Sequence, residues 1–393
     1  MNAAAEALRV GIDLRLRAYR GGGIAEHMSR LIAGLDLLNE AGPLHQGGRP
    51  FLPLRLEHRR GRGVGADGPF PARWLWTPPH HRLEGISLPV ELLGAGLSLL
   101  HSPDFIVPRF WRGRSVVTVH DLAFLRHPEL LTAASRRYYG QVHRSLRQAD
   151  AVIAVSRHTA SEIAALTDTK AQKVHVVPNA IHPRFSPRGD ETADRAAWDR
   201  HGLLTAEGPR PYVLFVSTIE PRKNLATLLR AFALLHRMDP RVQLVLAGDE
   251  GWLSSEVHAL ATELGLGESA RFLGRVTDED LAALYRGARL LAHPALDEGF
   301  GLPVAEALAS GTPVLASRAG SLPEIAGDAA LLLDPRDAGA WAQAMGRVLD
   351  DGALAARLRA AGPPRVARFT LRAMAEGTVA ATKAASPCSQ PAQ

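Results

Sequence analysis

Two hydrophobic patterns alternate along most of the chain. Short apolar runs such as residues 8–16, 115–121 and 151–156 are typical of buried strands. Longer stretches with apolar residues three and four positions apart, such as 23–38, are typical of helices packed on a sheet. The alternation predicts βαβ units and parallel sheets. Residues 40–85 fit this pattern less well, because they are rich in Gly, Pro and Arg.

The alternation begins again in the second half of the chain. Its expected strands are residues 212–219, 242–249, 270–276, 289–296, 312–317 and 330–335. Residues 184–211 are polar and contain several Pro and Gly, which predicts a connection between domains. We therefore expect an α/β fold of two Rossmann-like, doubly wound parallel-sheet domains. Ligands should bind beyond the carboxyl ends of the strands, in a cleft between these domains.

Composition indicates a globular protein, with 46% hydrophobic and 22% charged residues. No apolar run reaches the roughly 20 residues that span a bilayer. The first residues lack the basic start of a signal peptide, and the single cysteine, Cys388, allows no internal disulfide. These features favour a cytoplasmic protein, with peripheral binding to the inner membrane face as a further option.

Charge is distributed unevenly, since residues 1–190 hold 25 Lys and Arg against 16 Asp and Glu, whereas residues 191–393 hold 21 against 24. The basic half suggests an anionic partner, such as a phosphorylated substrate, an acidic membrane or nucleic acid. Charge that serves only solubility explains it equally well.

In the first half, candidate site residues follow expected strands. Gly22 and Gly23 open a helix, where backbone N–H groups could approach a phosphate, although a tight turn explains them equally well. His120 and Asp121 end an apolar strand, which favours a functional histidine. His101 occupies a similar position, but the Ser-Pro after it makes a turn or capping role as good an explanation.

In the second half, Arg222 and Lys223 stand where a loop becomes a helix. Cations at a helix N-terminus are mildly unfavourable, so a bound diphosphate explains them better than a solvated helix start does.

The stretch "DEGFGLPVAEALASGTPV" places Glu298 in a loop and Glu306 early in the next helix, which should begin near Pro303. The free N–H groups at this helix start form an expected anion site with the two acids on either side. We expect one acid to bind sugar hydroxyls and the other to bind ribose hydroxyls.

Other chemistries find no support in the sequence. The 16 histidines are scattered, one cysteine excludes thiolate sites, and neither a Walker A sequence nor a G-x-S-x-G elbow is present. The "GDE" at 248–250 is better explained as a turn than as a metal motif.

Several motifs together resemble retaining GT-B glycosyltransferases of family 4, the group 1 transferases that include bacterial mannosyltransferases. They are "VSTIEPRKNL", "RFLGRVTDEDLAALYRGARLLAHPALDEGFGLPVAEALASGTPVLAS", "SLPEIAGDAALLLDP" and, in the first half, "GGGIAEHMSRL", "VVTVHDLAFLRHPE" and "AVIAVSRHTASEI". The resemblance covers nearly the whole chain. It implies that His120 and Glu298 are catalytic and contact the donor sugar. The nucleotide-sugar-binding positions that it implies are Gly22, Gly23, Arg222, Lys223, Gly248, Val276, Glu298, Phe300, Gly301, Leu302 and Glu306.

The resemblance also assigns roles to the domains. Residues 1–190 would bind the acceptor, residues 205–365 would bind the nucleotide sugar, and a C-terminal helix, 366–385, would cross back onto the first domain. The expected reaction moves a hexose of the mannose or glucose type from a nucleotide diphosphate sugar to a glycan or lipid-linked acceptor, without metal or other cofactor and without nucleic acid, in cell-surface polysaccharide synthesis.

The alternatives are a sugar-nucleotide 2-epimerase, a phosphorylase-like enzyme, or a non-catalytic nucleotide-sugar binding protein. Ser217 and Thr218 replace the Gly-Arg pair frequent in the family, and "HPAL" at 293–296 replaces its usual Pro-Ser pattern.

Overall fold

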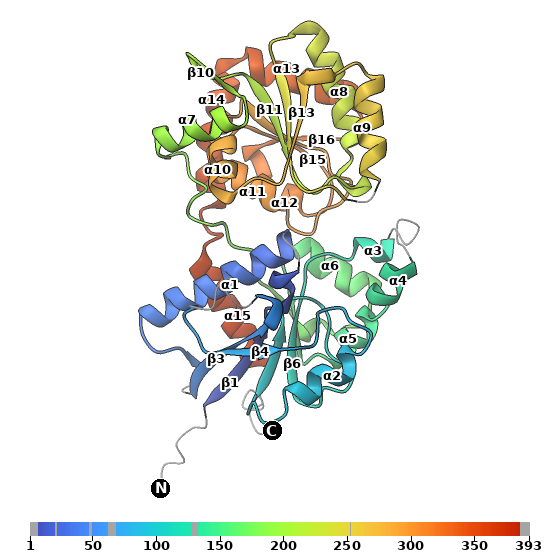
Figure 1. Cartoon of the computed structure of the whole chain (residues 1–393), viewed down its shortest axis with the longest axis vertical. Coiled ribbons are helices and arrows are strands. Elements are labelled where there is room, and N and C mark those ends of the chain that lie inside the picture. The colour runs from blue at the N-terminus through green and yellow to red at the C-terminus, as the bar shows by residue number, and fades with distance from the viewer. Residues whose placement is uncertain are drawn as a thin grey trace. The chain divides into compact units, whose positions relative to one another are not determined.

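The computed structural model describes residues 7–19, 22–46, 49–61, 68–126, 133–251 and 253–385. The chain forms two compact units (Figure 1). Unit 1 comprises the chain up to Ala180 and the part from Phe369 onward, and unit 2 comprises Ile181–Arg368. Unit 2 thus spans residues 181–368, whereas the sequence suggested a first domain of residues 1–190 and a second of residues 205–365.

The described part of unit 1 contains an eight-stranded sheet in the order β2-β3-β1-β5-β6-β7-β8, with β4 paired to β3. All pairings are parallel except that of β2 with β3. The strands are β1 (Leu8–Asp13), β2 (His45–Gln46), β3 (Arg49–His58), β4 (Ala72–Leu75), β5 (Leu99–Ser102), β6 (Arg114–Val119), β7 (Ala151–Ala154) and β8 (Val174–Val176). Because the chain leaves β1 toward β3 and returns to its other side at β5, the topological switch point lies between β1 and β5.

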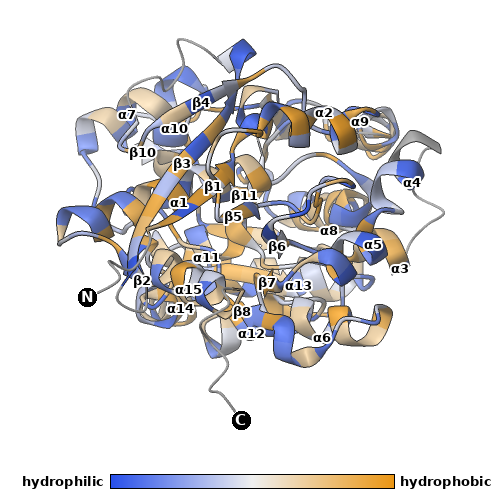
Figure 2. Cartoon of the chain, turned by 90° about the horizontal axis from the view of Figure 1, so that it is seen from below, coloured by the Kyte–Doolittle hydropathy of each residue, from blue (hydrophilic) through white to orange (hydrophobic). Residues whose placement is uncertain are grey.

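Helices cover the sheet of unit 1. They are α1 (Gly23–Glu40), α2 (Glu84–Glu91), α3 (Ala123–Arg126), α4 (Ala133–Tyr139), α5 (Val142–Gln148), α6 (Arg157–Leu166) and α15 (Leu371–Ala384), with the short 3-10 helices η1 (Arg15–Ala18), η2 (Arg59–Gly61) and η4 (Ala171–Lys173). Figure 2 shows β1 and β7 largely in the hydrophobic colour, as buried parallel strands require. The C-terminal α15 packs on α1, where a Cβ at Gly34 would lie 2.3 Å from the Leu371 carbonyl oxygen.

Residues 40–85 are more regular than their composition suggested. The structure places the ten-residue β3 and the short β4 there, and both join the main sheet. Pro53 lies inside β3, and Arg55 and Glu57 are buried in it. Proline and charged residues normally argue against an inner strand, which is why the pattern concealed this one.

Unit 2 contains a parallel six-stranded sheet in the order β13-β12-β11-β14-β15-β16. The strands are β11 (Tyr212–Val216), β12 (Gln243–Ala247), β13 (Ala270–Gly274), β14 (Leu290–His293), β15 (Val314–Ser317) and β16 (Leu331–Leu333). The helices are α8 (Leu225–Met238), α9 (Ser254–Glu263), α10 (Asp278–Gly287), α11 (Leu302–Ala309), α12 (Leu322–Ala326), α13 (Ala338–Asp350) and α14 (Gly352–Val366), with the 3-10 helices η5 (Pro221–Lys223), η6 (Gly267–Ser269) and η7 (Gly327–Ala329).

The expected connection at 184–211 is instead an ordered part of unit 2. It forms α7 (Glu191–Arg200) and a hairpin of β9 (Leu204–Thr205) with β10 (Gly208–Pro209). Asp194 of α7 pairs with Arg286 at 2.5 Å, and the Trp198 indole N–H donates to the Ala283 carbonyl oxygen. A polar sequence rich in Pro and Gly therefore hid a helix that is held by specific polar contacts.

Across the described residues, no helix combines the length and the apolar character that crossing a bilayer requires.

Candidate active site

The loop after β11 holds the two predicted cations of unit 2. It ends in η5, whose last residues are Arg222 and Lys223, and Asn224 then adopts the left-handed conformation before α8 begins. The Asn224 amide donates to the carbonyl oxygens of Pro294 (3.0 Å) and Pro335 (2.6 Å). Asparagine tolerates this backbone conformation better than most residues, so one side chain both forms the turn and ties it to two neighbouring loops.

The structure brings Lys223 and Glu298 into direct contact. The Lys223 ammonium lies 2.5 Å from Glu298 Oε1, and each side chain is only 9% exposed. His293, at the end of β14, is fully buried and places Nε2 2.9 Å from the same oxygen. The predicted phosphate ligand and the predicted sugar ligand thus form one buried ion pair, backed by a histidine.

Electrostatics keep this pair charged. Burial alone would raise the pKa of Glu298, but the Lys223 ammonium, the His293 hydrogen bond and Arg222 hold it well below its usual range. Burial lowers the pKa of His293, although Glu298 partly offsets this effect. A neutral His293 that donates from Nε2 to an ionised Glu298 follows at neutral pH, so Glu298 acts as an acceptor and not as a general acid.

Arg222 occupies the edge of the same cluster. Its guanidinium contacts Glu220 Oε1 at 3.0 Å, donates to the Asp297 carbonyl oxygen at 3.2 Å and lies 3.9 Å from Glu298 Oε2. The Leu296 N–H in turn donates to the Arg222 carbonyl oxygen. These contacts join the loop after β11 to the loop after β14, so both loops present their polar groups at the same edge of the sheet.

The loop into α11 depends on two glycines. Gly301 precedes α11 with φ +86°, and a Cβ there would lie 2.5 Å from Leu322 Cδ2. Gly320, with φ +57°, lies so close to the loop that its Cβ would be 2.4 Å from the Glu298 carbonyl oxygen, which also accepts from the Ser321 N–H. Only glycine allows both the backbone angle and the close approach. The helix begins at Leu302, one residue before Pro303.

Glu306 lies on α11 and is 5% exposed. The Tyr285 hydroxyl donates to its Oε2 at 3.2 Å. Glu298 and Glu306 therefore occupy a loop and a helix, as the sequence suggested, and have different partners. Gly248 directly follows β12, and a Cβ there would lie 2.0 Å from the Ser217 carbonyl oxygen. Val276 follows β13 at the same edge of the sheet.

The remaining predicted residues belong to unit 1. His120 directly follows β6, and its Nε2 lies 2.8 Å from the Pro103 carbonyl oxygen. Burial lowers the pKa of His120, while this hydrogen bond opposes the change. Because a carbonyl oxygen only accepts, the neutral ring carries its proton on Nε2 and leaves the Nδ1 lone pair as an acceptor.

His101 is a buried core residue and makes neither a turn nor a cap. It lies within β5 and is 1% exposed, and its Nε2 lies 3.1 Å from Thr118 Oγ1. Gly22, by contrast, is exposed and caps α1 with φ +110°, and a Cβ on either Gly22 or Gly23 would have no neighbour within 4 Å. Packing within the described residues thus does not explain this glycine pair.

Sequence reasoning missed His293, Asn224 and Gly320. The "HPAL" stretch was seen to differ from the family pattern, but its histidine was given no role. His293 ends an apolar strand, and the same position had selected His120 as a candidate, so this signal was present in the sequence. Asn224 and Gly320 act through backbone geometry, which residue type alone does not reveal.

Comparisons with known proteins identify the family of the chain. Residues 201–365 match the family model "Glycosyl transferases group 1", and residues 21–185 match "Glycosyltransferase Family 4". The chain is 37% identical over 243 residues to O-antigen chain mannosyltransferase B of Escherichia coli, a match that covers 61% of this chain and 62% of that protein. It is 30% identical over 307 residues to D-inositol 3-phosphate glycosyltransferase of Corynebacterium jeikeium, covering 75% and 72%.

Among solved structures, sucrose-phosphate synthase from Thermosynechococcus elongatus superposes with a TM-score of 0.73 at 22% identity, covering 94% of this chain and 97% of that one. The two parallel-sheet, Rossmann-like units are those of the GT-B fold class. Within that class, the chain belongs to the group 1 glycosyltransferases of family 4. The match spans less than two thirds of the O-antigen mannosyltransferase, so the activity of the whole protein is a matter for proposal.

Proposed function

We propose that the protein is a retaining hexosyltransferase that moves a mannose- or glucose-type residue from a nucleotide diphosphate sugar to a glycan or lipid-linked acceptor in cell-surface polysaccharide synthesis. One observation carries the proposal: the buried Lys223–Glu298 pair beside the start of α11, at the carboxyl edge of the unit 2 sheet. Family membership and the relationship to an O-antigen mannosyltransferase support it.

In this proposal the residues of unit 2 hold the donor. Lys223, Arg222 and the free N–H groups at the start of α11 offset the charge of the diphosphate. The ionised Glu298 accepts hydrogen bonds from sugar hydroxyls, and Glu306 accepts them from the ribose. Phe300, Gly301 and Leu302 supply backbone groups, and Gly248 and Val276 border the nucleotide from the neighbouring strands.

The reaction breaks the bond between the anomeric carbon and the leaving phosphate oxygen. The acceptor hydroxyl attacks from the face that the diphosphate leaves, and its proton passes to the departing diphosphate. His120 is neutral with its proton on Nε2, so it contacts the donor sugar through the Nδ1 lone pair. Gly22 and Gly23 leave room for the diphosphate or the acceptor at the start of α1.

An apolar stripe on unit 1 supports an acceptor that is presented at a membrane. Ile86 and Val90 lie on α2, Leu83 and Leu93 lie just beyond its two ends at helical spacing, and all four are 54–72% exposed. Phe110, 56% exposed, adjoins the stripe because its N–H donates to the Gly85 carbonyl oxygen. An exposed apolar helix face of this kind is typical of interfacial membrane binding.

The exposed side chains of Arg82, Arg109 and Arg112 flank this stripe in the sequence. Basic residues next to an apolar stripe favour anionic lipids. We expect the protein to sediment with phosphatidylglycerol vesicles more than with phosphatidylcholine vesicles, and Ile86→Glu to remove the difference. Met238→Glu, at a 69% exposed position in unit 2, is the matched control and should sediment as wild type does.

A donor screen tests the proposed activity. Thermal unfolding is measured with GDP-mannose, UDP-glucose, UDP-galactose and UDP-GlcNAc, because a ligand that binds only the folded state raises the melting temperature. The donor that binds is then incubated with and without glycan acceptors, and the anomeric configuration of the product is determined by NMR. Failure of all four nucleotide sugars to bind, or an inverted product, would refute the proposal.

The alternatives give different products from the same assay. A 2-epimerase converts the donor to its epimer or releases the free epimeric sugar, a phosphorylase-like enzyme requires inorganic phosphate, and a binding protein gives a thermal shift without turnover. Lys170→Met, at an exposed position in unit 1, serves as the control for variants of Lys223.

A further inference from the structure

Unit 1 contains a pocket at the switch point of its sheet. Asp13 ends β1 and Ser102 ends the adjacent β5, and both line the pocket. The pocket is open, and the empty space in and around it, which includes solvent, amounts to about 320 Å³. In open parallel sheets, ligands bind beyond the carboxyl ends of the strands at this point. None of its lining residues is among those that the sequence had assigned to a site.

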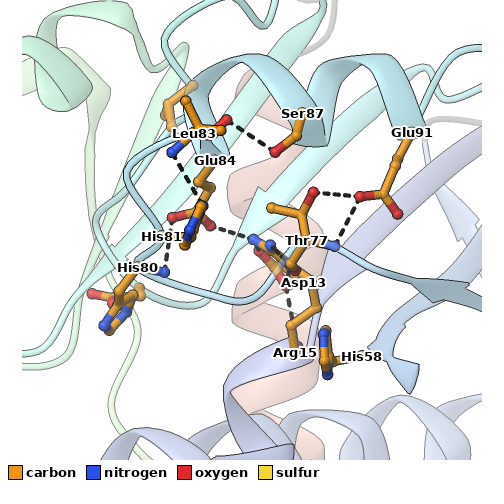
Figure 3. Close-up of polar contacts among 12 residues, drawn as sticks. Asp13, Arg15, His58, Thr77, His80, His81, Leu83, Glu84, Ser87 and Glu91 are labelled. Atoms are coloured by element: carbon orange, nitrogen blue, oxygen red, sulfur yellow. Dashed lines mark hydrogen bonds and ion pairs between the residues drawn. The ribbon is translucent and has the colours of Figure 1, made fainter. Parts of the chain in front are cut away.

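Three carboxylates line the pocket. They belong to Asp13, Glu84 and Asp104, and no lysine or arginine is among the described lining residues. Arg15 lies behind the pocket, where its guanidinium pairs with Asp13 Oδ2 at 2.7 Å and also with Glu84 (Figure 3). One cation thus faces two of the acids from the protein side, and the lining keeps an excess of negative charge.

Each acid has a fixed orientation. Asp104 Oδ2 accepts from the Tyr138 hydroxyl at 2.6 Å and lies 3.2 Å from His80 Nε2. Burial would raise the pKa of Asp104, but the bonds from His80 and Tyr138 lower it below its usual value. Glu84 Oε2 accepts from the His80 N–H, which Figure 3 shows together with the Arg15 contacts. The carboxylates are therefore preorganised as hydrogen-bond acceptors.

One hydroxyl of the lining is available to a ligand. Ser102 is 4% exposed and lines the pocket, and its hydroxyl, which stays accessible, makes no hydrogen bond within the described part of the chain. The apolar remainder of the lining, which includes Leu16, Met28 and Ile106, could pack against the C–H face of a sugar ring.

We propose that this pocket binds the terminal sugar of the acceptor and that it selects an uncharged, polyhydroxylated sugar over a phosphorylated one. Carboxylates accept hydrogen bonds from hydroxyls but repel a phosphate, and no cation lines the described pocket to balance one. The inference rests on the proposed transferase function. It separates this chain from the relative whose name specifies an inositol phosphate, and it runs against the anionic acceptor that the basic first half suggests.

The test compares acceptors of matched shape. With the donor that gives a thermal shift, nucleoside diphosphate release is measured against methyl α-D-mannopyranoside and its 6-phosphate, and binding is followed by ligand-observed NMR. We expect the uncharged mannoside to bind at least tenfold more tightly than the phosphate. Equal or tighter binding of the phosphate, or no binding of the uncharged mannoside while the donor binds, would overturn the inference.

Ser102→Ala provides the sharpest variant. Its hydroxyl has no partner in the described part of the free protein, so its removal should leave the melting temperature unchanged and raise the acceptor KM about threefold to tenfold. Ser115→Ala is the matched control, because Ser115 is also a buried strand residue whose hydroxyl lacks a partner in the described structure, yet it does not line the pocket. An equal acceptor KM in the two variants would contradict the assignment.

Asp104→Asn provides a second, stronger change. It removes the charge at similar size, and the acceptor KM should rise about tenfold to hundredfold, because hydrogen bonds to charged groups are the stronger ones. Asp168→Asn, at a side chain that is 86% exposed, is its control. If Asp104→Asn does not fold, the Ser102 comparison still decides. If the wild-type protein binds none of the nucleotide sugars, the transferase proposal is refuted. If it binds a donor but does not prefer the uncharged sugar to its phosphate, only this inference is refuted.

Discussion

The Lys223–Glu298 pair leads to a quantitative prediction. Lys223→Met keeps the length of the side chain and removes its charge, which leaves the buried Glu298 carboxylate with His293 and the more distant Arg222. Both members of the pair are 9% exposed and 2.5 Å apart. Removing one partner of a buried pair costs about 3–5 kcal/mol, because the remaining charge stays desolvated. We expect the free energy of unfolding to fall by this amount at pH 8.

The loss should depend on pH, because Lys223 lowers the pKa of His293. Without the ammonium, the folded-state pKa of His293 rises, and a protonated His293 can neutralise Glu298. A lowered folded pKa costs stability as the pH falls below the unfolded value of about 6.5, and the variant, whose His293 pKa is less lowered, should lose less than the wild type. The difference between Lys223→Met and the wild type should therefore shrink as the pH falls below about 6.5.

A double-mutant cycle measures the coupling. Urea unfolding of the wild type, Lys223→Met, Glu298→Gln and the double variant is followed by circular dichroism and tryptophan fluorescence. The double variant should be less destabilised than the sum of the single variants by about 1–3 kcal/mol. Lys170→Met should lie within about 0.5 kcal/mol of the wild type. A loss below about 1 kcal/mol for Lys223→Met at pH 8, or additive single effects, would refute the reasoning.

Three further predictions concern geometry and titration. Asn224→Ala should lower the free energy of unfolding by about 2–3 kcal/mol, because it removes two hydrogen bonds to carbonyl oxygens and a residue that tolerates φ +57°. Asn224→Gly, which tolerates this φ but makes neither hydrogen bond, should recover part of the loss in urea unfolding. Gly320→Ala should weaken donor binding severalfold by calorimetry, because its Cβ would push the Glu298 carbonyl, whereas Gly352→Ala, with nothing within 4 Å, should not. Burial and His120 lower the pKa of His101 to about 3, so the unfolded state takes up a proton first. This one group should lower the free energy of unfolding by about 1.4 kcal/mol per pH unit below about pH 6.5, and His101→Gln should reduce the slope by about that amount in urea unfolding between about pH 6.5 and pH 5.

The expected fold followed from the sequence because its strands are continuous apolar runs. Such runs mark strands that are buried on both faces, and the second-half strands lie at the predicted positions with shorter ends. β3 was not predicted because it contains Pro53, Arg55 and Glu57, which are unusual inside a strand. α7 was not predicted because it is held by contacts such as the Asp194–Arg286 ion pair, which join residues far apart in the sequence.

The residues proposed to hold the donor were chosen from the sequence, but their pairing could not be predicted from it. Arg222 and Lys223 follow one strand and Glu298 follows another, and only the strand order β11-β14 makes those loops neighbours. Residue types and spacing alone do not indicate that Lys223 and Glu298 neutralise each other. His293 contacts Glu298 because it lies at the end of β14, directly before the loop that carries Glu298. Residue type alone does not reveal this contact.

The net charge of a long stretch of sequence can differ in sign from the charge that lines a binding pocket within it. The excess of Lys and Arg in residues 1–190 suggested an anionic partner, but a sum over so many residues is dominated by exposed side chains. Arg82, Arg109 and Arg112 are exposed and flank the apolar stripe in the sequence, whereas the carboxylates of Asp13 and Asp104 line a pocket. A ligand responds to the groups within a few ångströms, because water and salt screen distant charges. Our two proposals, that the basic half binds an anionic membrane and that its pocket selects an uncharged sugar, are therefore compatible.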